Sequence, residues 1–209
     1  MRTTIKKLTK SRAKERAIHI IQESMKDLPG IRWMIGDNPR TQRSKLKALA
    51  EYVFELSWKK DGLLLSRDKN GVAILIRQNT KTRSKLYLGC ALKFVLNCTG
   101  FKRMLEIVKR EKYIQSQHPS NGDYLYSWIY AVHPDARGFR ASVELKNRVF
   151  AESDRTGLPI YLETTVAKNK RVYQRYGFEI YHKWFIEKRG VTMWFMRRNP
   201  FTDENQVKI

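Results

Sequence analysis

The chain is organised around residues 129–142, IYAVHPDARGFRAS. Apolar residues on both parities predict a strand over about 124–133 with both faces covered. Pro134 ends this strand because proline cannot donate a ladder hydrogen bond. A helix is predicted next, over about 139–155. A strand that feeds a turn and then a helix aims backbone N–H groups at one point, so this stretch predicts an anion site.

The remaining elements follow from hydrophobic periodicity and turn residues. Downstream, the pattern predicts a strand over 160–164, a short helix over 170–176, and a closing hairpin of strands over 178–186 and 191–197. Upstream, it predicts a weak edge strand over 1–8, helices over 11–27 and 41–57, a hairpin of strands over 63–65 and 72–76, and a helical region over 85–117 that breaks at Thr99 and Gly100. This order is typical of a mixed α/β sheet with helices on its faces.

The length of 209 residues fits one domain. We divide residues 1–209 into a helical N-terminal part over 1–60, a sheet and cofactor-binding core over 61–198, and a tail over 199–209. No stretch reaches the roughly 18 apolar residues of a membrane span, so no membrane partner is expected. A monomer or a homodimer is expected.

The charge of the chain is strongly positive, with 42 Lys and Arg against 20 Asp and Glu, a net charge of +22. Such a surface attracts polyanions, including nucleic acids and anionic small molecules. The basic residues are spread over the whole chain and are not gathered in one tail. We therefore do not favour a nucleic-acid partner but keep it as an alternative.

The cysteines and histidines indicate neither a disulfide framework nor a metal site. Cys90 and Cys98 are the only cysteines, too few for a four-thiolate zinc site. The four histidines show no ligand spacing, so no metal is expected. Two free thiols without a signal peptide favour a cytoplasmic location.

Two groups of residues carry a family resemblance. The first is Val132-His133-Pro134 followed by Arg137 and Gly138, and the second is Leu162-Glu163-Thr164, Asn169, Tyr173 and Gly177-Phe178. On these residues the chain resembles the GNAT superfamily, the Gcn5-related N-acetyltransferases. The resemblance covers about residues 60–198 and is specific over 124–178. It implies a GNAT-like mixed, mostly antiparallel central sheet flanked by helices, and acetyl-CoA as the acyl donor.

The resemblance also implies roles for individual residues. The backbone of Tyr130 and Val132 would face the thioester, Asn169 would contact the cofactor, and Tyr173 would protonate the thiolate leaving group. Glu163, at the end of a strand, is a candidate base or amine contact. The pyrophosphate would lie on the turn and helix start formed by Arg137, Gly138, Phe139, Arg140, Ala141 and Ser142.

The turn departs from the family pattern at two positions. Arg140 stands where the family has a glycine, and Ser142 stands where it has glycine or alanine. Glycine allows close backbone approach, which a larger residue hinders. Arg140 either points outward and leaves the backbone N–H groups usable, or weakens cofactor binding.

The resulting hypothesis is an acetyl-CoA-dependent N-acetyltransferase that acts on a primary amine by direct attack in a ternary complex. The acceptor is a small-molecule or peptide amine, which fold-level kinship does not specify further. Two alternatives remain open: a weakly active or non-catalytic protein that binds a polyanion such as RNA, and an acyltransferase that uses a longer acyl-CoA.

Overall fold

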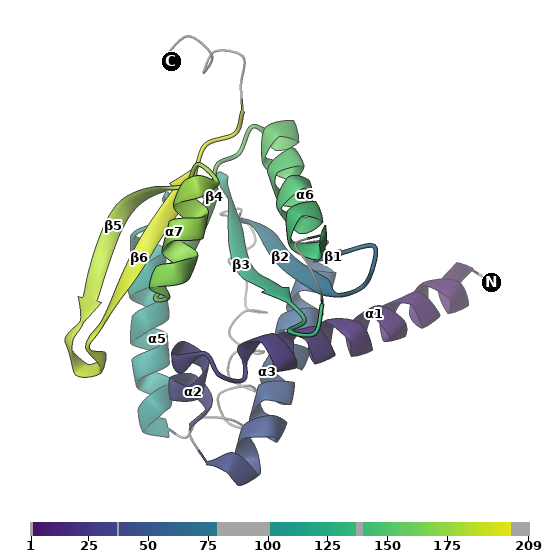
Figure 1. Cartoon of the computed structure of the whole chain (residues 1–209), viewed down its shortest axis with the longest axis horizontal. Coiled ribbons are helices and arrows are strands. Elements are labelled where there is room, and N and C mark those ends of the chain that lie inside the picture. The colour runs from purple at the N-terminus through teal and green to yellow at the C-terminus, as the bar shows by residue number, and fades with distance from the viewer. Residues whose placement is uncertain (1, 37, 79–100, 137–139, 202–209) are drawn as a thin grey trace.

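A computed structural model describes residues 2–36, 38–78, 101–136 and 140–201. Its centre is a six-stranded sheet in the order β1-β2-β3-β4-β6-β5 (Figure 1). The strands are β1 (Leu63–Leu65), β2 (Gly71–Gln78), β3 (Tyr124–Val132), β4 (Ile160–Thr164), β5 (Glu179–Ile186) and β6 (Val191–Arg198). Within this sheet β3 and β4 run parallel, and the other neighbouring pairs are antiparallel. The predicted mixed, mostly antiparallel sheet is confirmed.

Helices cover both faces of the sheet (Figure 1). They are α1 (Arg2–Met25), α2 (Pro29–Ile35), α3 (Pro39–Lys59), α5 (Phe101–Ser116), α6 (Arg140–Thr156) and α7 (Ala167–Arg175). Alternate residues of β2 face opposite sides, so Ile74 packs in the core under α1 and α3, while Ala73 packs in the core under α6. On the α1 side of the sheet, α5 packs against β6, where Ile114 meets Met193 and Phe195.

A β-bulge interrupts β3 near its middle. The pairing with β2 shifts between Ile74 and Leu75, and this shift leaves Trp128 as the extra residue. A bulge bends its strand and increases the local twist. Beyond the bulge, β3 stays paired with β2 as far as Val132.

The parallel strands β3 and β4 separate soon after they begin to pair. Their register holds for two residues of each strand and ends at Tyr126 and Tyr161. Beyond this point β3 continues beside β2, and β4 continues beside β6. We call the place where the two strands part, just past Tyr126 and Tyr161, the strand split.

Three sequence predictions need correction or lie outside the described residues. The strand over 1–8 is wrong, since α1 begins at Arg2; Ile5 and Leu8 are three residues apart, a helical rather than alternating spacing. The helix α2 has no counterpart among the predicted elements; it begins at Pro29, and proline is well tolerated at the first helical position. Of the predicted helix over 85–117, residues 85–100, with both cysteines, lie outside the description.

Candidate active site

A pocket of about 190 Å³ opens at the strand split, between α6 and α7. Its floor comes from Ser127 of β3 and Leu162 of β4, the residues that directly follow the last paired positions on the two strands. The other lining residues are Tyr130, Ser142, Lys146, Val149, Phe150, Asn169, Val172, Tyr173, Tyr176 and Phe178. The pocket therefore exists because β3 and β4 part, and two helices of the same face wall it in.

The start of α6 forms one end of this pocket. Arg140 is the first residue of the helix and its side chain is exposed, Ala141 is buried, and Ser142 lines the pocket. The first N–H groups of any helix have no partner within the helix and can bind an anion. Arg137, Gly138 and Phe139, which were predicted to bind the cofactor, lie outside the described residues. Val132 ends β3, and its carbonyl oxygen accepts a hydrogen bond of 2.7 Å from Ser24 Oγ.

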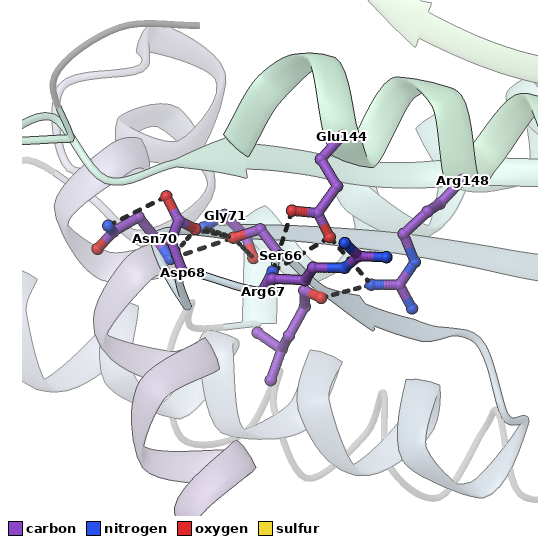
Figure 2. A network of polar contacts seen from close by, with 8 residues as sticks. Ser66, Arg67, Asp68, Asn70, Gly71, Glu144 and Arg148 are labelled. Carbon is purple, nitrogen blue, oxygen red and sulfur yellow. Dashed lines mark hydrogen bonds and ion pairs between the residues drawn. The ribbon is translucent and has the colours of Figure 1, made fainter. Parts of the chain in front are cut away.

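The turn between β1 and β2 holds α6 against the sheet (Figure 2). The backbone N–H of Arg67 donates to both carboxylate oxygens of Glu144, each at 3.1 Å, and Arg148 Nη1 donates to the carbonyl of Leu65 at 2.5 Å. Gly71 lies directly under the helix, where an added Cβ would stand 2.7 Å from Leu145 Cδ1. These contacts fix the position of the helix start relative to β3.

Tyr173 of α7 lines the pocket, as its predicted role requires. Its ring packs on Phe178, with centroids 5.6 Å apart. Burial, with a smaller contribution from Tyr130 and Tyr176, raises the pKa of Tyr173 to about 12. The hydroxyl therefore stays protonated at neutral pH, and among the described residues nothing forms a hydrogen bond with it.

Tyr130 and Asn169, two residues with expected roles in donor binding, also line the pocket. The hydroxyl of Tyr130 donates to the backbone carbonyl of Ser142, so it ties β3 to the first turn of α6. Lys146 was not predicted. Its ammonium group lies 5.2 Å from the ring centre of Tyr176, across the pocket from α6 to α7. The sequence signal was a lysine one turn beyond Ser142 on the same helix face.

Glu163 lies on the other face of the sheet from the pocket. Its neighbour Leu162 lines the pocket, and successive side chains of a strand point to opposite faces. The Glu163 carboxylate accepts a hydrogen bond from Tyr126 Oη at 2.7 Å and lies 2.7 Å from His118 Nε2. The structure thus brings Tyr130, Ser142, Asn169 and Tyr173 together and places Glu163 behind them, through the sheet.

Among residues 2–36, 38–78, 101–136 and 140–201, no group of three or more His, Cys, Asp or Glu side chains could hold a metal ion. Within the same ranges, no helix has the length and apolar character needed to cross a membrane.

Comparisons of the sequence find no matching family profile and no similar curated protein. Comparisons of the structure find acetyltransferases. One is a single Corynebacterium glutamicum protein described as "histone acetyltransferase HPA2 and related acetyltransferase". It is similar at a TM-score of 0.59 and 20% identity, over 91% of this chain and 93% of that one. Arylalkylamine N-acetyltransferase 2 from Aedes aegypti is similar at a TM-score of 0.60 and 12% identity, over 90% and 95%.

A third structure carries the family name. It is a Desulfovibrio desulfuricans protein assigned to the GNAT family, similar at a TM-score of 0.51 and 13% identity, over 90% of this chain and 92% of that one. At sequence identities this low, the structural similarity establishes a shared fold and does not by itself establish a shared activity. Together with the strand split, the pocket and the helix start beside it, this similarity confirms the fold that the sequence resemblance implied: the chain has the fold of the GNAT acetyltransferases.

Proposed function

We propose that the protein is an acetyl-CoA-dependent N-acetyltransferase, which transfers an acetyl group to a primary amine by direct attack in a ternary complex. The observation that carries this proposal is the pocket at the strand split, because the start of α6 and the side chain of Tyr173 both line it. An anion site and a protonated hydroxyl are the two features that a thioester of coenzyme A requires. The fold of the neighbouring structures supports the same reading.

The start of α6 suits the pyrophosphate of the donor. The side chain of Arg140 is exposed, and this exposure supports retained binding of the anion at the helix start despite the missing glycine. Lys146 adds a positive charge beside the same pocket. We assign donor binding to the helix start from Arg137 to Ser142, to the backbone of Tyr130 and Val132, and to Asn169.

The chemistry needs one proton removed and one supplied. The amine must be neutral when its nitrogen attacks the thioester carbonyl, and we assign the removal of its proton to Glu163. As the C–N bond forms and the C–S bond breaks, the thiolate takes the proton of Tyr173. Backbone N–H groups of β3 near Tyr130 and Val132 would stabilise the charge on the carbonyl oxygen. Cys90 and Cys98 have no role in a direct attack.

The acceptor is a primary amine of a small molecule or a peptide. The Aedes aegypti neighbour is an arylalkylamine N-acetyltransferase, which supports including arylalkylamines among the candidates. The cytoplasm, where acetyl-CoA and free thiols coexist, is the location we assign.

The test measures donor binding first and turnover second. Acetyl-CoA at a concentration 100 times its dissociation constant should stabilise the fold by about 2.7 kcal/mol, seen as a rise in melting temperature. A panel of arylalkylamines, amino acids, polyamines and peptides is then screened for release of free coenzyme A thiol. No melting shift at millimolar acetyl-CoA, together with salt-sensitive retention of RNA, would overturn the enzyme and favour the polyanion-binding alternative.

A further inference from the structure

The hairpin of β5 and β6 carries an exposed patch on the face of the sheet that holds the pocket. In Figure 1 this hairpin runs on beyond the end of α7. Met196 of β6 packs in the core under α6, and Trp194, two residues before it, faces the same side. Lys183 is the cross-strand partner of Trp194, and Phe185 is the partner of Thr192, so their side chains face that side too. We call Lys183, Phe185, Thr192 and Trp194 the hairpin platform.

A β-bulge in β5 keeps the nearest acidic residue of the strand off this platform. The pairing with β6 shifts at Tyr181, which is an extra residue on β5. Before the bulge, Glu179 lies opposite Arg197 and forms an ion pair with it at 4.0 Å. Because Arg197 directly follows Met196 on β6, this pair faces the α5 side of the sheet. The bulge therefore places Glu179 and Lys183 on opposite faces.

Phe185 is the most exposed large hydrophobic side chain in the part of the chain that the structure describes, at 59%. Trp194 is its diagonal neighbour across the hairpin, a distance that aromatic side chains can span. Exposed aromatic rings on a strand can stack with the bases of a single-stranded nucleic acid, and every base has a flat face for this contact. A single exposed apolar side chain is nevertheless common, so the ring alone indicates no ligand.

The helix α7 adds a row of positive charges beside the platform. Lys168, Arg171 and Arg175 are exposed and are spaced three and then four residues apart, which places them on one face of the helix. We call these three residues the α7 row. Lys170 lies between the row and the platform, with its Nζ atom 4.9 Å from the ring centre of Trp194. The row and Lys170 thus continue the positive charge of Lys183 onto the helix.

These charges are not neutralised nearby. The sequence of α7 contains no aspartate or glutamate. No acidic side chain among the described residues pairs with Lys183 or with any member of the α7 row. The hairpin has two acidic residues, of which Glu179 faces the α5 side and Glu187 lies in the turn at its tip. Basic residues that are scattered along the sequence are therefore gathered by the fold into one surface, which attracts polyanions.

The combination of a ring and a basic row is specific to this surface among the described residues. The helix α3 carries exposed Arg40, Arg43 and Lys47 at the same spacing. The one other exposed aromatic side chain of the described residues is Phe201, at 57%, and its backbone N–H donates to the carboxylate of Asp154. Hence α3 has the charge without the ring, and Phe201 has the ring beside a negative charge.

We propose that the hairpin platform and the α7 row bind a single-stranded nucleic acid, with a base stacked on Phe185 and phosphates against Lys183 and the α7 row. An acidic peptide would meet the same charges but offers no flat ring for Phe185. A second copy of this chain would bring like charges together. The proposal goes beyond the acetyltransferase activity proposed above and does not depend on it.

The test is a binding titration of the full chain with a labelled single-stranded RNA oligonucleotide, followed by fluorescence anisotropy at several salt concentrations. The logarithm of the association constant should fall linearly with the logarithm of the salt concentration, with a slope of about −0.7 for each phosphate contact. The same sequence as a duplex is titrated in parallel, because a duplex keeps the phosphates but hides the faces of its bases.

Phe185→Ala isolates the stacking contact. Binding of the single strand should weaken roughly 5–150-fold, the loss expected for one stacked base, with the salt slope unchanged. Binding of the duplex should not change. Phe201→Ala is the matched control, since it removes an equally exposed ring, and it should leave both affinities within about twofold. Because Phe185 is exposed, its variant should melt within about 2 °C of the wild-type chain.

Lys183→Gln isolates the phosphate contact. The salt slope should become shallower by about 0.7, which corresponds to one lost contact. Lys47→Gln is the matched control, because it removes the same charge from the basic row of α3 and leaves the platform intact. Its slope should equal that of the wild-type chain. None of these residues lines the pocket, so the melting shift caused by acetyl-CoA should be unchanged in all four variants.

Four results would overturn the proposal. The first is no binding of the single strand, and the second is a Phe185→Ala variant that binds it as tightly as the wild-type chain. The third is polyglutamate binding that also weakens in Phe185→Ala, which would identify an acidic peptide as the partner. The fourth is a dimer in sedimentation that Phe185→Ala dissociates, which would identify a second copy.

The two proposals fail separately. A wild-type chain that shows the acetyl-CoA melting shift but binds no single strand overturns only the nucleic-acid surface. A chain that binds the single strand through Phe185 but shows neither a melting shift nor turnover contradicts only the proposed acetyltransferase.

Discussion

Replacing Tyr173 with phenylalanine tests the leaving-group acid directly. The hydroxyl has no hydrogen-bond partner among the described residues, so its removal should change the free energy of unfolding by less than about 1 kcal/mol. Its loss as an acid should lower kcat by about 10²–10⁴-fold. At 1.36 kcal/mol for each tenfold change, this range is about 2.7–5.4 kcal/mol of activation free energy. The predicted effect on turnover therefore exceeds the predicted effect on stability.

The pKa of Tyr173 fixes the sign of its pH dependence. Burial raises this pKa to about 12, so the proton-donating form persists at neutral and moderately alkaline pH. The wild-type chain should lose no activity from ionisation of Tyr173 below about pH 10, the ordinary tyrosine pKa. The same shift favours the fold below the unfolded pKa, and this contribution is lost as the pH rises through about 12.

The assay follows thiol release at saturating acetyl-CoA, with a thermal melt of each protein. Tyr176→Phe removes a hydroxyl from the same pocket wall and should cost less than Tyr173→Phe. Equal turnover in wild type and Tyr173→Phe would refute the reasoning, because an acid cannot be dispensable if it protonates the leaving group. A large fall in melting temperature would show instead that the hydroxyl serves the fold.

Three further predictions concern the scaffold around the pocket. Ser66→Ala removes the acceptor, at 2.8 Å, of the buried N–H of Gly71, so urea unfolding should show a loss of about 1–3 kcal/mol (Figure 2); an unchanged midpoint would contradict the role of this bond. Leu145→Ala empties a fully buried position between α6 and the sheet and should cost about 2–5 kcal/mol in the same measurement, with a smaller loss expected only if the helix collapses into the space. Arg140→Ala should leave the melting shift caused by acetyl-CoA unchanged because its side chain is exposed, whereas a reduced shift would show that the guanidinium reaches the donor.

Local patterns in the sequence determined most of the elements near the pocket. The strand over 160–164 matches β4 residue for residue, and the helix predicted over 139–155 is α6, shifted by one residue at each end. Both follow from periodicity, since a buried strand and an amphipathic helix each repeat within a few residues. The motif around Tyr173 also lies within a few neighbouring residues of the sequence, and in the structure this side chain lines the pocket.

The boundaries of the helices and the structure of the N-terminal region were harder to predict from the sequence. The helix α7 begins three residues before its predicted start at Lys170, and α1 extends through residues that resembled a strand. Short apolar spacings are ambiguous between helix and strand, and tertiary contacts decide between them. The pairing of α1 with the core under β2 and β3 is such a contact.

Local sequence patterns were enough to predict that a strand, a turn and a helix follow one another at residues 124–156 and that Tyr173 comes after the next strand. Where β3 and β4 part follows from the assembled sheet, because their register ends at Tyr126 and Tyr161 and β3 then continues beside β2 alone. The packing of whole elements also leaves the side chain of Arg140 exposed and brings Glu163 to His118 on the far face. Residues 45 positions apart share no local pattern, so their contact is set by the packing of whole elements and not by the spacing of side chains along the chain.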